Sequence, residues 1–296
     1  MNNINVQKKI NLLNYTSIKV GGCTEYFSQP SSTTELINHV KWAKFNNLKC
    51  RVIGAGSNLL IKNTLISGLT ICTKKLNAIT LDASSGFVEA DCGVMLPVMS
   101  NLLAKNACKG GEWIIGIPGT VGGAIFMNAG SSSFEISNHL LSVQVIDKET
   151  LEIINIDKKD LTFQYRFSIF QENKLILLSA KFNFEPQGNK ELISKLTKEN
   201  LKIKTESQPY NMPSFGSVFK NPKNYFAGKL IEELGFKGFQ LGGAQVSTMH
   251  ANFIVNKSNA SSEDIYNLIT LIQEKILQKK GIFLHPEVRM IGFDYP

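Results

Sequence analysis

The chain has 296 residues, of which 43% are hydrophobic and 19% charged, which allows two or three globular domains with buried cores. The formal net charge is +8, but the basic residues are scattered and no basic-aromatic module occurs, so the composition favours small anionic ligands over nucleic acid. Five cysteines without metal or redox spacing, no signal-peptide core and no membrane-spanning apolar run predict a cytoplasmic protein without a metal site or a membrane partner.

The first predicted element is a turn over residues 14–22, where hydroxyl side chains precede two glycines. Thr16 and Gly21 could line a ligand there, or the hydroxyls could cap the turn. A helix is predicted over residues 33–46, with Thr34 as its N-cap.

Two apolar strands are predicted within residues 51–61, on either side of a Gly-x-Gly-Ser-Asn loop. Ser57 and Asn58 in this loop can bind a phosphate or their own backbone. A Gly-x-Gly pattern alone is weak evidence for a nucleotide site, but a second glycine-rich stretch in the same chain strengthens it.

That second stretch is 116–130, which contains five glycines and follows short predicted strands between 68 and 93 and a helix over 97–107. Glycine permits unusual torsions and close approach of a ligand, and consecutive inward N–H groups bind phosphate. Asn128 can bond a polar ring edge or a ribose. No Gly-Lys-Ser/Thr follows, and no Rossmann pattern surrounds the stretch. It predicts another kind of nucleotide cradle, although a tight turn leading into a buried strand is the alternative.

A hairpin is predicted from residues 141–147 and 152–156, and a strand from 174–184. Between them, Arg166 lies among aromatic residues, where a charge is costly unless it is paired. Arg166 is therefore a functional cation or a salt-bridged core arginine.

The composition changes at residues 185–190, which indicates a domain boundary before an amphipathic helix ending near Ser207. A loop with three prolines over 208–222 presents Ser217, Lys220 and Asn221. No Gly-x-Ser-x-Gly elbow occurs, which argues against a serine hydrolase.

Near the C-terminus, helices are predicted over 227–234 and over 261–280, the latter with a Ser-x-x-Asp cap. His250 is interpreted as a structural histidine. Glu287 follows a proline at the head of a strand, where it is a fixed acid or a surface partner of Arg289.

These motifs occur together in one order: Thr-Ser-x-x-x-Gly-Gly, Gly-x-Gly-Ser-Asn, Gly-Ile-Pro-Gly-Thr-Val-Gly-Gly-Ala-x-x-Met-Asn-Ala-Gly, Tyr-Arg, Gly-Ser-Val-Phe-Lys-Asn-Pro, Gly-Gly-Ala-x-Val-Ser and Pro-Glu-Val. From about Asn14 to Gly292 the chain resembles the UDP-N-acetylenolpyruvoylglucosamine reductase (UDP-N-acetylmuramate dehydrogenase) family of bacterial peptidoglycan synthesis.

The resemblance implies an α+β fold. A two-part FAD-binding unit of the PCMH type would cover residues 1–186, with subdomains at about 1–66 and 67–186, and a smaller α+β substrate-binding domain would cover 187–296. It also implies that NADPH reduces a non-covalently bound FAD, and that hydride then passes to the enolpyruvyl group of the UDP-sugar to give UDP-N-acetylmuramate.

The resemblance also assigns roles to residues. By motif, Arg166 matches the catalytic arginine, Ser217 the proton donor and Glu287 the catalytic acid. Substrate contacts fall on Tyr165, Lys220, Asn221 and Gln245. Cofactor contacts fall on Thr16, Gly21, Gly54, Gly56, Ser57, Asn58, Leu59, Gly116, Pro118, Gly119, Thr120, Gly122, Gly123, Ala124, Asn128, Ala129 and Gly130.

The segment between Arg166 and Ser217 is short, which matches family members without the loop whose tyrosine closes over the substrate. Cys23 follows the glycine pair and is interpreted as a packing residue. Two other functions stay open on the residues alone: a flavin oxidase of the same cofactor fold acting on an alcohol or sugar, and a non-catalytic nucleotide-binding protein. The sequence does not predict the oligomeric state.

Overall fold

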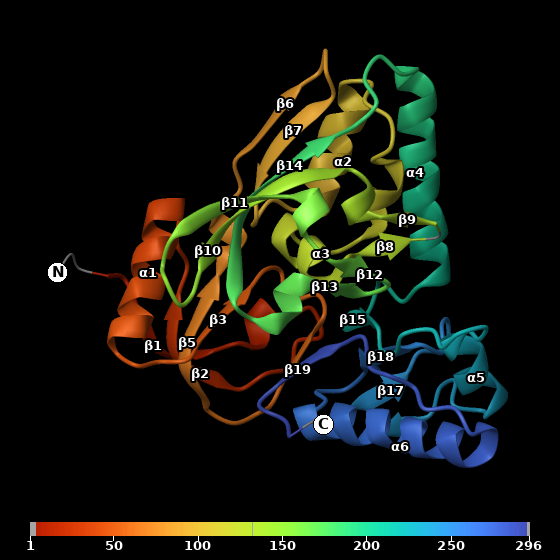
Figure 1. Ribbon diagram of the computed structural model, residues 1–296. Helices are drawn as coiled ribbons and strands as arrows, with labels where there is room; N and C mark the ends of the chain where they lie inside the picture. Colours follow the sequence, from red (N-terminus) through yellow and green to blue (C-terminus); the bar gives the residue numbers. More distant parts are fainter. Residues whose placement is uncertain (1–3, 132, 295–296) are drawn as a thin grey trace. The chain divides into compact units, whose positions relative to one another are not determined.

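The computed structural model describes residues 4–131 and 133–294 (Figure 1). Contacts divide the chain into two compact units. The first contains residues up to Gln7, Tyr26–Ala55 and Gly68–Lys204, and the second contains Lys8–Glu25, Gly56–Ser67 and the residues from Thr205 onward. This division differs from a boundary at residue 186 because two N-terminal segments group with the C-terminal residues. Contacts within the chain do not show which residues bind the cofactor and which bind the substrate. The assignment of residues 1–186 to the cofactor and 187–296 to the substrate therefore stays a prediction.

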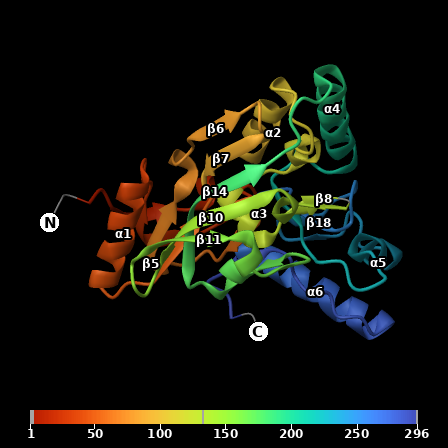
Figure 2. The same cartoon turned by 45° about the horizontal axis from the view of Figure 1, so that its top comes forward.

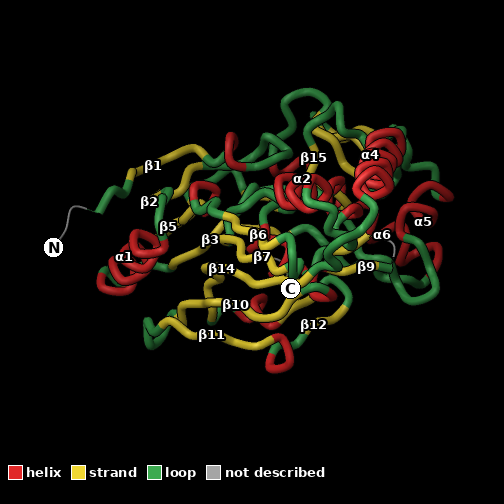
Figure 3. The backbone as a smooth tube through the Cα atoms, turned by 90° about the horizontal axis from the view of Figure 1, so that it is seen from above, coloured by secondary structure: helices red, strands yellow, loops and turns green. Residues whose placement is uncertain are grey.

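The first unit is built on an antiparallel sheet with strand order β11-β10-β14-β7-β6. Figures 2 and 3 show these strands side by side. In the register, Ala180 pairs with both Val143 and Ala90, so the three strands bury one face together. The predicted hairpin and strands are confirmed. The strand bounds are β6 (Ile79–Asp82), β7 (Phe87–Asp91), β10 (Leu140–Asp147), β11 (Ile153–Asp157) and β14 (Leu175–Asn183).

A second sheet has the order β1-β2-β5-β3, and its strands are β1 (Gln7–Asn11), β2 (Cys23–Ser28), β3 (Cys50–Ile53) and β5 (Ile66–Cys72). The boundary between the units falls within β1, β2 and β5. β3 runs parallel to β5. Helix α1 (Thr33–Phe45) is capped by Ser32, whose side chain accepts a hydrogen bond from the N–H of Glu35. The predicted cap at Thr34 is therefore wrong by two residues, because Thr34 already lies within the first turn.

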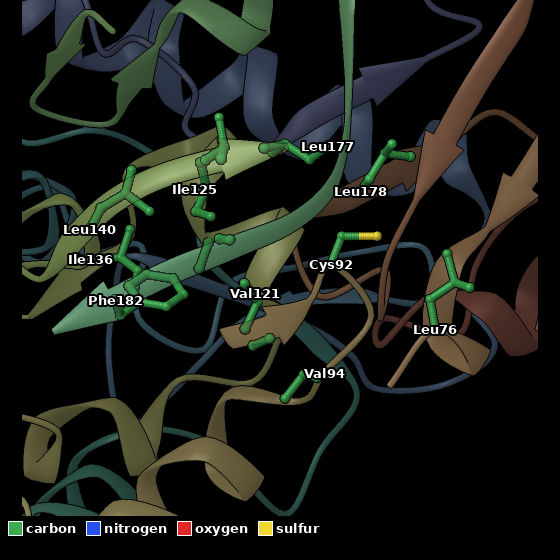
Figure 4. Close-up of a cluster of buried hydrophobic side chains, with 14 of the residues drawn as sticks. Leu76, Cys92, Val94, Val121, Ile125, Ile136, Leu140, Leu177, Leu178 and Phe182 are labelled. Atoms are coloured by element: carbon green, nitrogen blue, oxygen red, sulfur yellow. The ribbon is translucent and has the colours of Figure 1, made fainter. Parts of the chain in front are cut away.

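Helix α3 (Val121–Met127) packs its apolar side on the core of the first unit. Figure 4 shows Ile125 beside Ile136, Leu140 and Phe182. Each of these side chains is at most 2% exposed, and burial of one such side chain contributes about 1.5–3 kcal/mol to stability. This packing anchors the glycine-rich stretch to the sheet.

The remaining elements of the first unit are mostly short, and helix α4 is the longest of them. They are α2 (Leu96–Lys105), the 3-10 turn η3 (Glu112–Gly116), β8 (Gly130–Ser131), β9 (Phe134–Glu135), β12 (Phe163–Gln164), β13 (Phe167–Ser168), the 3-10 turn η6 (Ile169–Glu172) and α4 (Lys190–Ser207), which continues past the division at Lys204. Further 3-10 turns of this unit are η2 (Thr73–Lys75), η4 (Ile136–Asn138) and η5 (Lys158–Asp160), whereas η1 (Leu13–Tyr15) belongs to the second unit.

In the second unit, helix α6 (Ser262–Lys280) runs along a sheet with the order β15-β18-β17-β16 (Figure 1). The predicted cap of α6 is confirmed, because Ser261 and Asp264 form a reciprocal capping box. The other elements are β4 (Leu59–Ile61), β15 (Ser214–Ser217), α5 (Ala227–Glu233), β16 (Gln240–Leu241), β17 (Ala244–Val246), β18 (Phe253–Asn256) and β19 (Arg289–Ile291). Strand β19 lies parallel to β4.

None of the helices in the described ranges combines the length and apolarity needed to cross a bilayer. Over the same ranges, no group of three or more His, Cys, Asp or Glu side chains is arranged to hold a metal ion.

Candidate active site

Arg166 lies at the tip of a two-residue hairpin in the first unit. Gln164 of β12 pairs with Phe167 of β13, so Tyr165 and Arg166 form the loop. Arg166 has a φ of 54°, which is left-handed backbone. This conformation costs a residue with a Cβ about 1–2 kcal/mol, and turns of this kind favour glycine or asparagine. A bulky arginine held in a strained turn suggests that function selects the side chain.

The hairpin is tied to the C-terminal end of α3 by side-chain hydrogen bonds. The hydroxyl of Ser168 donates to the carbonyl of Phe126 at 2.7 Å. The amide of Gln171 donates to the same carbonyl at 3.1 Å and to the carbonyl of Arg166 at 3.2 Å. The last carbonyls of a helix have no partner within the helix, so both donors satisfy the end of α3, and the Gln171 amide also bonds the Arg166 turn.

The guanidinium of Arg166 is half-buried and directed by its neighbours. Its Nη2 donates to the carbonyl of Gly130 at 3.0 Å, and its Cζ lies 5.0 Å from the centre of the Tyr165 ring. The geometry therefore places a cation beside the end of the glycine-rich stretch and beside an aromatic face.

Lys204 is a second cation in this part of the first unit. Its stem covers Gly116, because a Cβ on that glycine would come within 2.6 Å of Lys204 Cγ. Burial, and then the nearby charge of Arg166, lower the pKa of the Lys204 ammonium. No carboxylate of the described residues pairs with it. No sequence motif marks Lys204, which is one of several lysines on an amphipathic helix.

Asn128 connects the glycine-rich stretch to the hairpin. It ends α3 in the left-handed conformation and is fully buried. Its amide donates to Glu135 Oε2 at 2.7 Å and to the carbonyl of Gln164 at 3.0 Å, while Oδ1 has no partner among the described residues. Sequence reasoning did not find Glu135. The cofactor contact assigned to Asn128 stays a prediction, since its amide serves the fold.

The first unit brings parts of both glycine loops together. A Cβ on Gly54 would collide with Oγ1 of Thr120, and a Cβ on Gly122 would come within 2.9 Å of the Cys92 side chain. Glycine is required at both positions for close packing. The tight-turn interpretation of residues 116–130 is wrong for residues 121–127, which form helix α3 capped by Thr120.

The backbone N–H groups just before helix α3 indicate whether an anionic cofactor would fit there. Gly119 and Thr120 are both buried, yet within the described residues neither backbone N–H donates a hydrogen bond. Buried N–H groups are almost always paired in folded proteins. The pair therefore fits a ligand with acceptor oxygens, such as the diphosphate of a dinucleotide.

The second unit holds the rest of the Gly-x-Gly-Ser-Asn loop. Gly56 has a φ of 68°, and a Cβ there would collide with the carbonyl of Tyr15. Across this part of the chain that the structure describes, the N–H groups of Gly56, Ser57 and Asn58 donate to no acceptor. Three consecutive free donors after a left-handed glycine fit an anion in the same way. The Thr16 hydroxyl instead donates to the carbonyl of Val20 at 2.8 Å, within its own turn.

In the second unit, Ser217 ends β15, and Glu287 lies between the Phe219–Pro286 bridge and the start of β19, next to the residue that follows Ser217. The N–H of Glu287 donates to the carbonyl of Val218 at 2.8 Å, and Asn58 Nδ2 donates to the carbonyl of Glu287 at 3.0 Å. Gly216 precedes Ser217 with a φ of 80° at an irregularity in β15, which turns the strand at this point.

Asn252 is a residue of this region that the sequence did not indicate. It is 4% exposed, and its side chain binds Phe219 at both backbone groups: Oδ1 accepts from the N–H at 3.0 Å and Nδ2 donates to the carbonyl at 2.8 Å. It holds the segment that follows Ser217. His250 accepts a hydrogen bond from the N–H of Asn252 at 3.2 Å through Nδ1, in agreement with its interpretation as a structural histidine.

The residues predicted to contact substrate lie in both units and have structural partners. Asn221 Oδ1 accepts from the N–H of Ala227 at the start of α5, and Gln245 Nε2 donates to the carbonyl of Gly238, each at 3.0 Å. The N–H of Lys220 donates to the carbonyl of His285, and Tyr165 is 48% exposed beside Arg166. These contacts leave the substrate assignments as predictions.

Comparisons with known proteins agree with this arrangement. An FAD binding domain model matches residues 24–156, and the model of the UDP-N-acetylenolpyruvoylglucosamine reductase C-terminal domain matches residues 208–291. A UDP-N-acetylenolpyruvoylglucosamine reductase of Prochlorococcus marinus subsp. pastoris is 64% identical over 296 residues, covering all of both chains. A protein of that name from Prochlorococcus marinus strain MIT 9313 is 46% identical over 291 residues, which is 98% of this chain and 95% of the relative.

The fold also matches a solved structure. The crystal structure of UDP-N-acetylenolpyruvylglucosamine reductase from Thermus caldophilus has a TM-score of 0.80 and 29% sequence identity, and the match covers 97% of this chain and 98% of that one. With full-length identity of this order, the α+β architecture and the ordered motifs, the chain belongs to the UDP-N-acetylenolpyruvoylglucosamine reductase family.

Proposed function

We propose that the protein uses NADPH and FAD to reduce UDP-N-acetylenolpyruvoylglucosamine to UDP-N-acetylmuramate in peptidoglycan synthesis. The observation that carries the proposal is Arg166, a cation held in a strained turn beside the glycine-rich stretch. Such a cation suits a substrate whose reacting group bears a carboxylate. Full-length identity to reductases of this name supports the same conclusion.

Residues of both glycine loops would hold FAD non-covalently. The free N–H groups of Gly119 and Thr120 in the first unit, and of Gly56, Ser57 and Asn58 in the second, are suited to bind phosphate oxygens. FAD, when bound, accepts a hydride from NADPH and delivers it to the substrate. In this proposal residues 1–186 bind the cofactor and residues 187–296 bind the UDP-sugar.

The side chains of Arg166, Glu287 and Ser217 would act on the enolpyruvyl group. Hydride adds to the terminal alkene carbon, so negative charge develops on the carboxylate as an enolate. Arg166 binds this carboxylate through paired N–H groups, and Glu287, if protonated, donates a further hydrogen bond to it, which stabilises the transition state more than the ground state. Lys204 raises the local positive potential.

Ser217 would complete the reduction. The carbon next to the carboxylate needs a proton, and a hydroxyl held in line can transfer one to an enolate. Hydride and proton together add two hydrogens across the double bond, while NADPH is oxidised to NADP⁺. Gly216 and Asn252 hold the two ends of the Ser217 segment, so its hydroxyl has a defined place.

An anaerobic titration tests the proposal. NADPH should bleach the yellow flavin of the purified protein, and UDP-N-acetylenolpyruvoylglucosamine should restore the colour in the absence of oxygen. A flavin oxidase would recover its colour in air but not with the enolpyruvyl nucleotide. A protein that takes up no FAD, or whose flavin is not bleached by NADPH, would contradict the proposal.

A further inference from the structure

We propose that Gln171 is a positioning residue, whose side-chain amide holds the Arg166 turn in its left-handed conformation so that the guanidinium is preset for the substrate carboxylate. The inference rests on the proposed role of Arg166 and adds a residue that determines where that arginine can act.

The amide of Gln171 joins two parts of the first unit. Gln171 belongs to η6, directly after β13, and its Nε2 reaches the carbonyls of Phe126 at 3.1 Å and of Arg166 at 3.2 Å. A carboxamide nitrogen has two N–H donors, which allows one for each carbonyl. One side chain therefore links the backbone of Arg166 to the last turn of α3.

This link is needed because the hairpin cannot hold the turn alone. Strands β12 and β13 contribute two residues each, and an isolated hairpin is marginal in water even when longer. The left-handed backbone of Arg166 is unfavourable for a residue with a Cβ. A hydrogen bond to the carbonyl of that same residue favours the strained conformation over a relaxed one.

The consequence concerns the direction of the side chain. When φ of a residue changes from left-handed to right-handed, the Cα–Cβ bond points elsewhere. Arg166 would then lose its bond to the carbonyl of Gly130, which is 3.0 Å long in the strained turn. Loss of the Gln171 amide should therefore weaken substrate binding indirectly, through Arg166. In this proposal Gln171 itself bonds α3 and the turn, not the substrate.

Ser168 provides a matched control. Its hydroxyl donates to the same Phe126 carbonyl at 2.7 Å but, within the described residues, makes no hydrogen bond to Arg166. Gln171→Met keeps the length of the side chain and removes both donors, whereas Ser168→Ala removes a bond to α3 only. Any loss common to both variants reports the attachment to α3, and any loss confined to Gln171→Met reports the turn.

The experiment uses the FAD-loaded protein. The Kd of UDP-N-acetylenolpyruvoylglucosamine for the oxidised protein is measured by calorimetry, and the two half-reactions are followed by stopped-flow absorbance. For Gln171→Met we expect about tenfold weaker binding and at least tenfold slower flavin reoxidation by the nucleotide, a change of about 1.4 kcal/mol per tenfold. Flavin reduction by NADPH should stay within threefold of wild type. Ser168→Ala should leave all three values within threefold.

A second mutation separates this inference from the proposed function. Arg166→Gln should reduce binding and reoxidation strongly, and Gln171→Met added to it should cause no further loss, because both act through one guanidinium. If Arg166→Gln has no effect, the role of Arg166 is wrong. If it acts but Gln171→Met matches wild type, matches Ser168→Ala or slows both half-reactions equally, the positioning role is wrong. Should Gln171→Met not fold, Gln171→Asn, which is too short to reach both carbonyls, takes its place.

Discussion

Ser217 is a residue whose function can be separated from its structural role. Its proposed task arises only after hydride has reached the substrate, so Ser217→Ala should leave flavin reduction by NADPH near normal. Loss of one positioned acid typically costs ~10²–10⁴-fold, about 3–5 kcal/mol of barrier, in the second half-reaction. Melting temperature and FAD content should not change. Reoxidation by the enolpyruvyl nucleotide within threefold of wild type, measured by stopped-flow absorbance, would remove Ser217 from the mechanism.

Lys204 is expected to lower the stability of the ligand-free protein while it contributes to binding of the UDP-sugar. Its ammonium is partly buried near Arg166, so Lys204→Met should raise the melting temperature of the ligand-free protein, on the order of 2 °C. The same change should reduce the additional stabilisation given by the UDP-sugar, because ligand stabilisation follows affinity. Thermal melts with and without nucleotide measure both effects. Lys198→Met, an exposed lysine on the same helix, is the control and should change neither.

At the scale of elements, the cap of α6 gives a prediction about acid stability. Asp264 Oδ2 accepts from the N–H of Ser261 at 2.9 Å and of Gly243 at 3.1 Å, and these bonds lower the pKa of Asp264. A lowered folded pKa stabilises the protein above the unfolded value, near 4, and this stability is lost progressively as the pH falls from there through the folded pKa. Asp264→Asn should cost about 1 kcal/mol at pH 7 and much less at pH 3. Urea unfolding at the two pH values measures the difference, and an equal cost at both would contradict the ionic contribution.

The elements that the sequence predicted well are those with strong local signals. Apolar alternation located β10, β11 and β14, and the Ser-x-x-Asp pattern located the start of α6. Helix α3 was missed because Gly122 and Gly123 each lower helix propensity by about 1 kcal/mol relative to alanine. Tertiary packing of Val121 and Ile125 on the core overrides that preference.

The site was predicted only as far as its motifs extend. Arg166, Ser217 and Glu287 lie in recognisable patterns, but Gln171, Lys204, Asn252 and Glu135 do not. Two of these four, Gln171 and Asn252, act through hydrogen bonds to residues distant in sequence, such as Asn252 with Phe219. A single sequence has no local pattern that marks such pairs, so only the fold reveals them.

At the scale of the whole molecule, the proposed reaction predicts that NADPH and the UDP-sugar exclude one another. Each must present a reacting carbon to the same flavin atom, one to give a hydride and the other to receive it. Beyond the two glycine loops assigned to FAD, the sequence predicts no third glycine-rich cradle for a further dinucleotide. NADPH should therefore leave as NADP⁺ before the sugar nucleotide binds.

This order has a kinetic signature. Initial rates plotted against one substrate at several fixed concentrations of the other should give parallel double-reciprocal lines. Each substrate should also inhibit at excess, because it then occupies the flavin oxidation state with which the other substrate reacts. The two half-reactions should also proceed separately when each substrate is added alone. Intersecting lines, together with a complex that holds both nucleotides at once, would show that the binding sites are independent. Both substrates would then have access to the flavin at the same time, and their predicted mutual exclusion would be wrong.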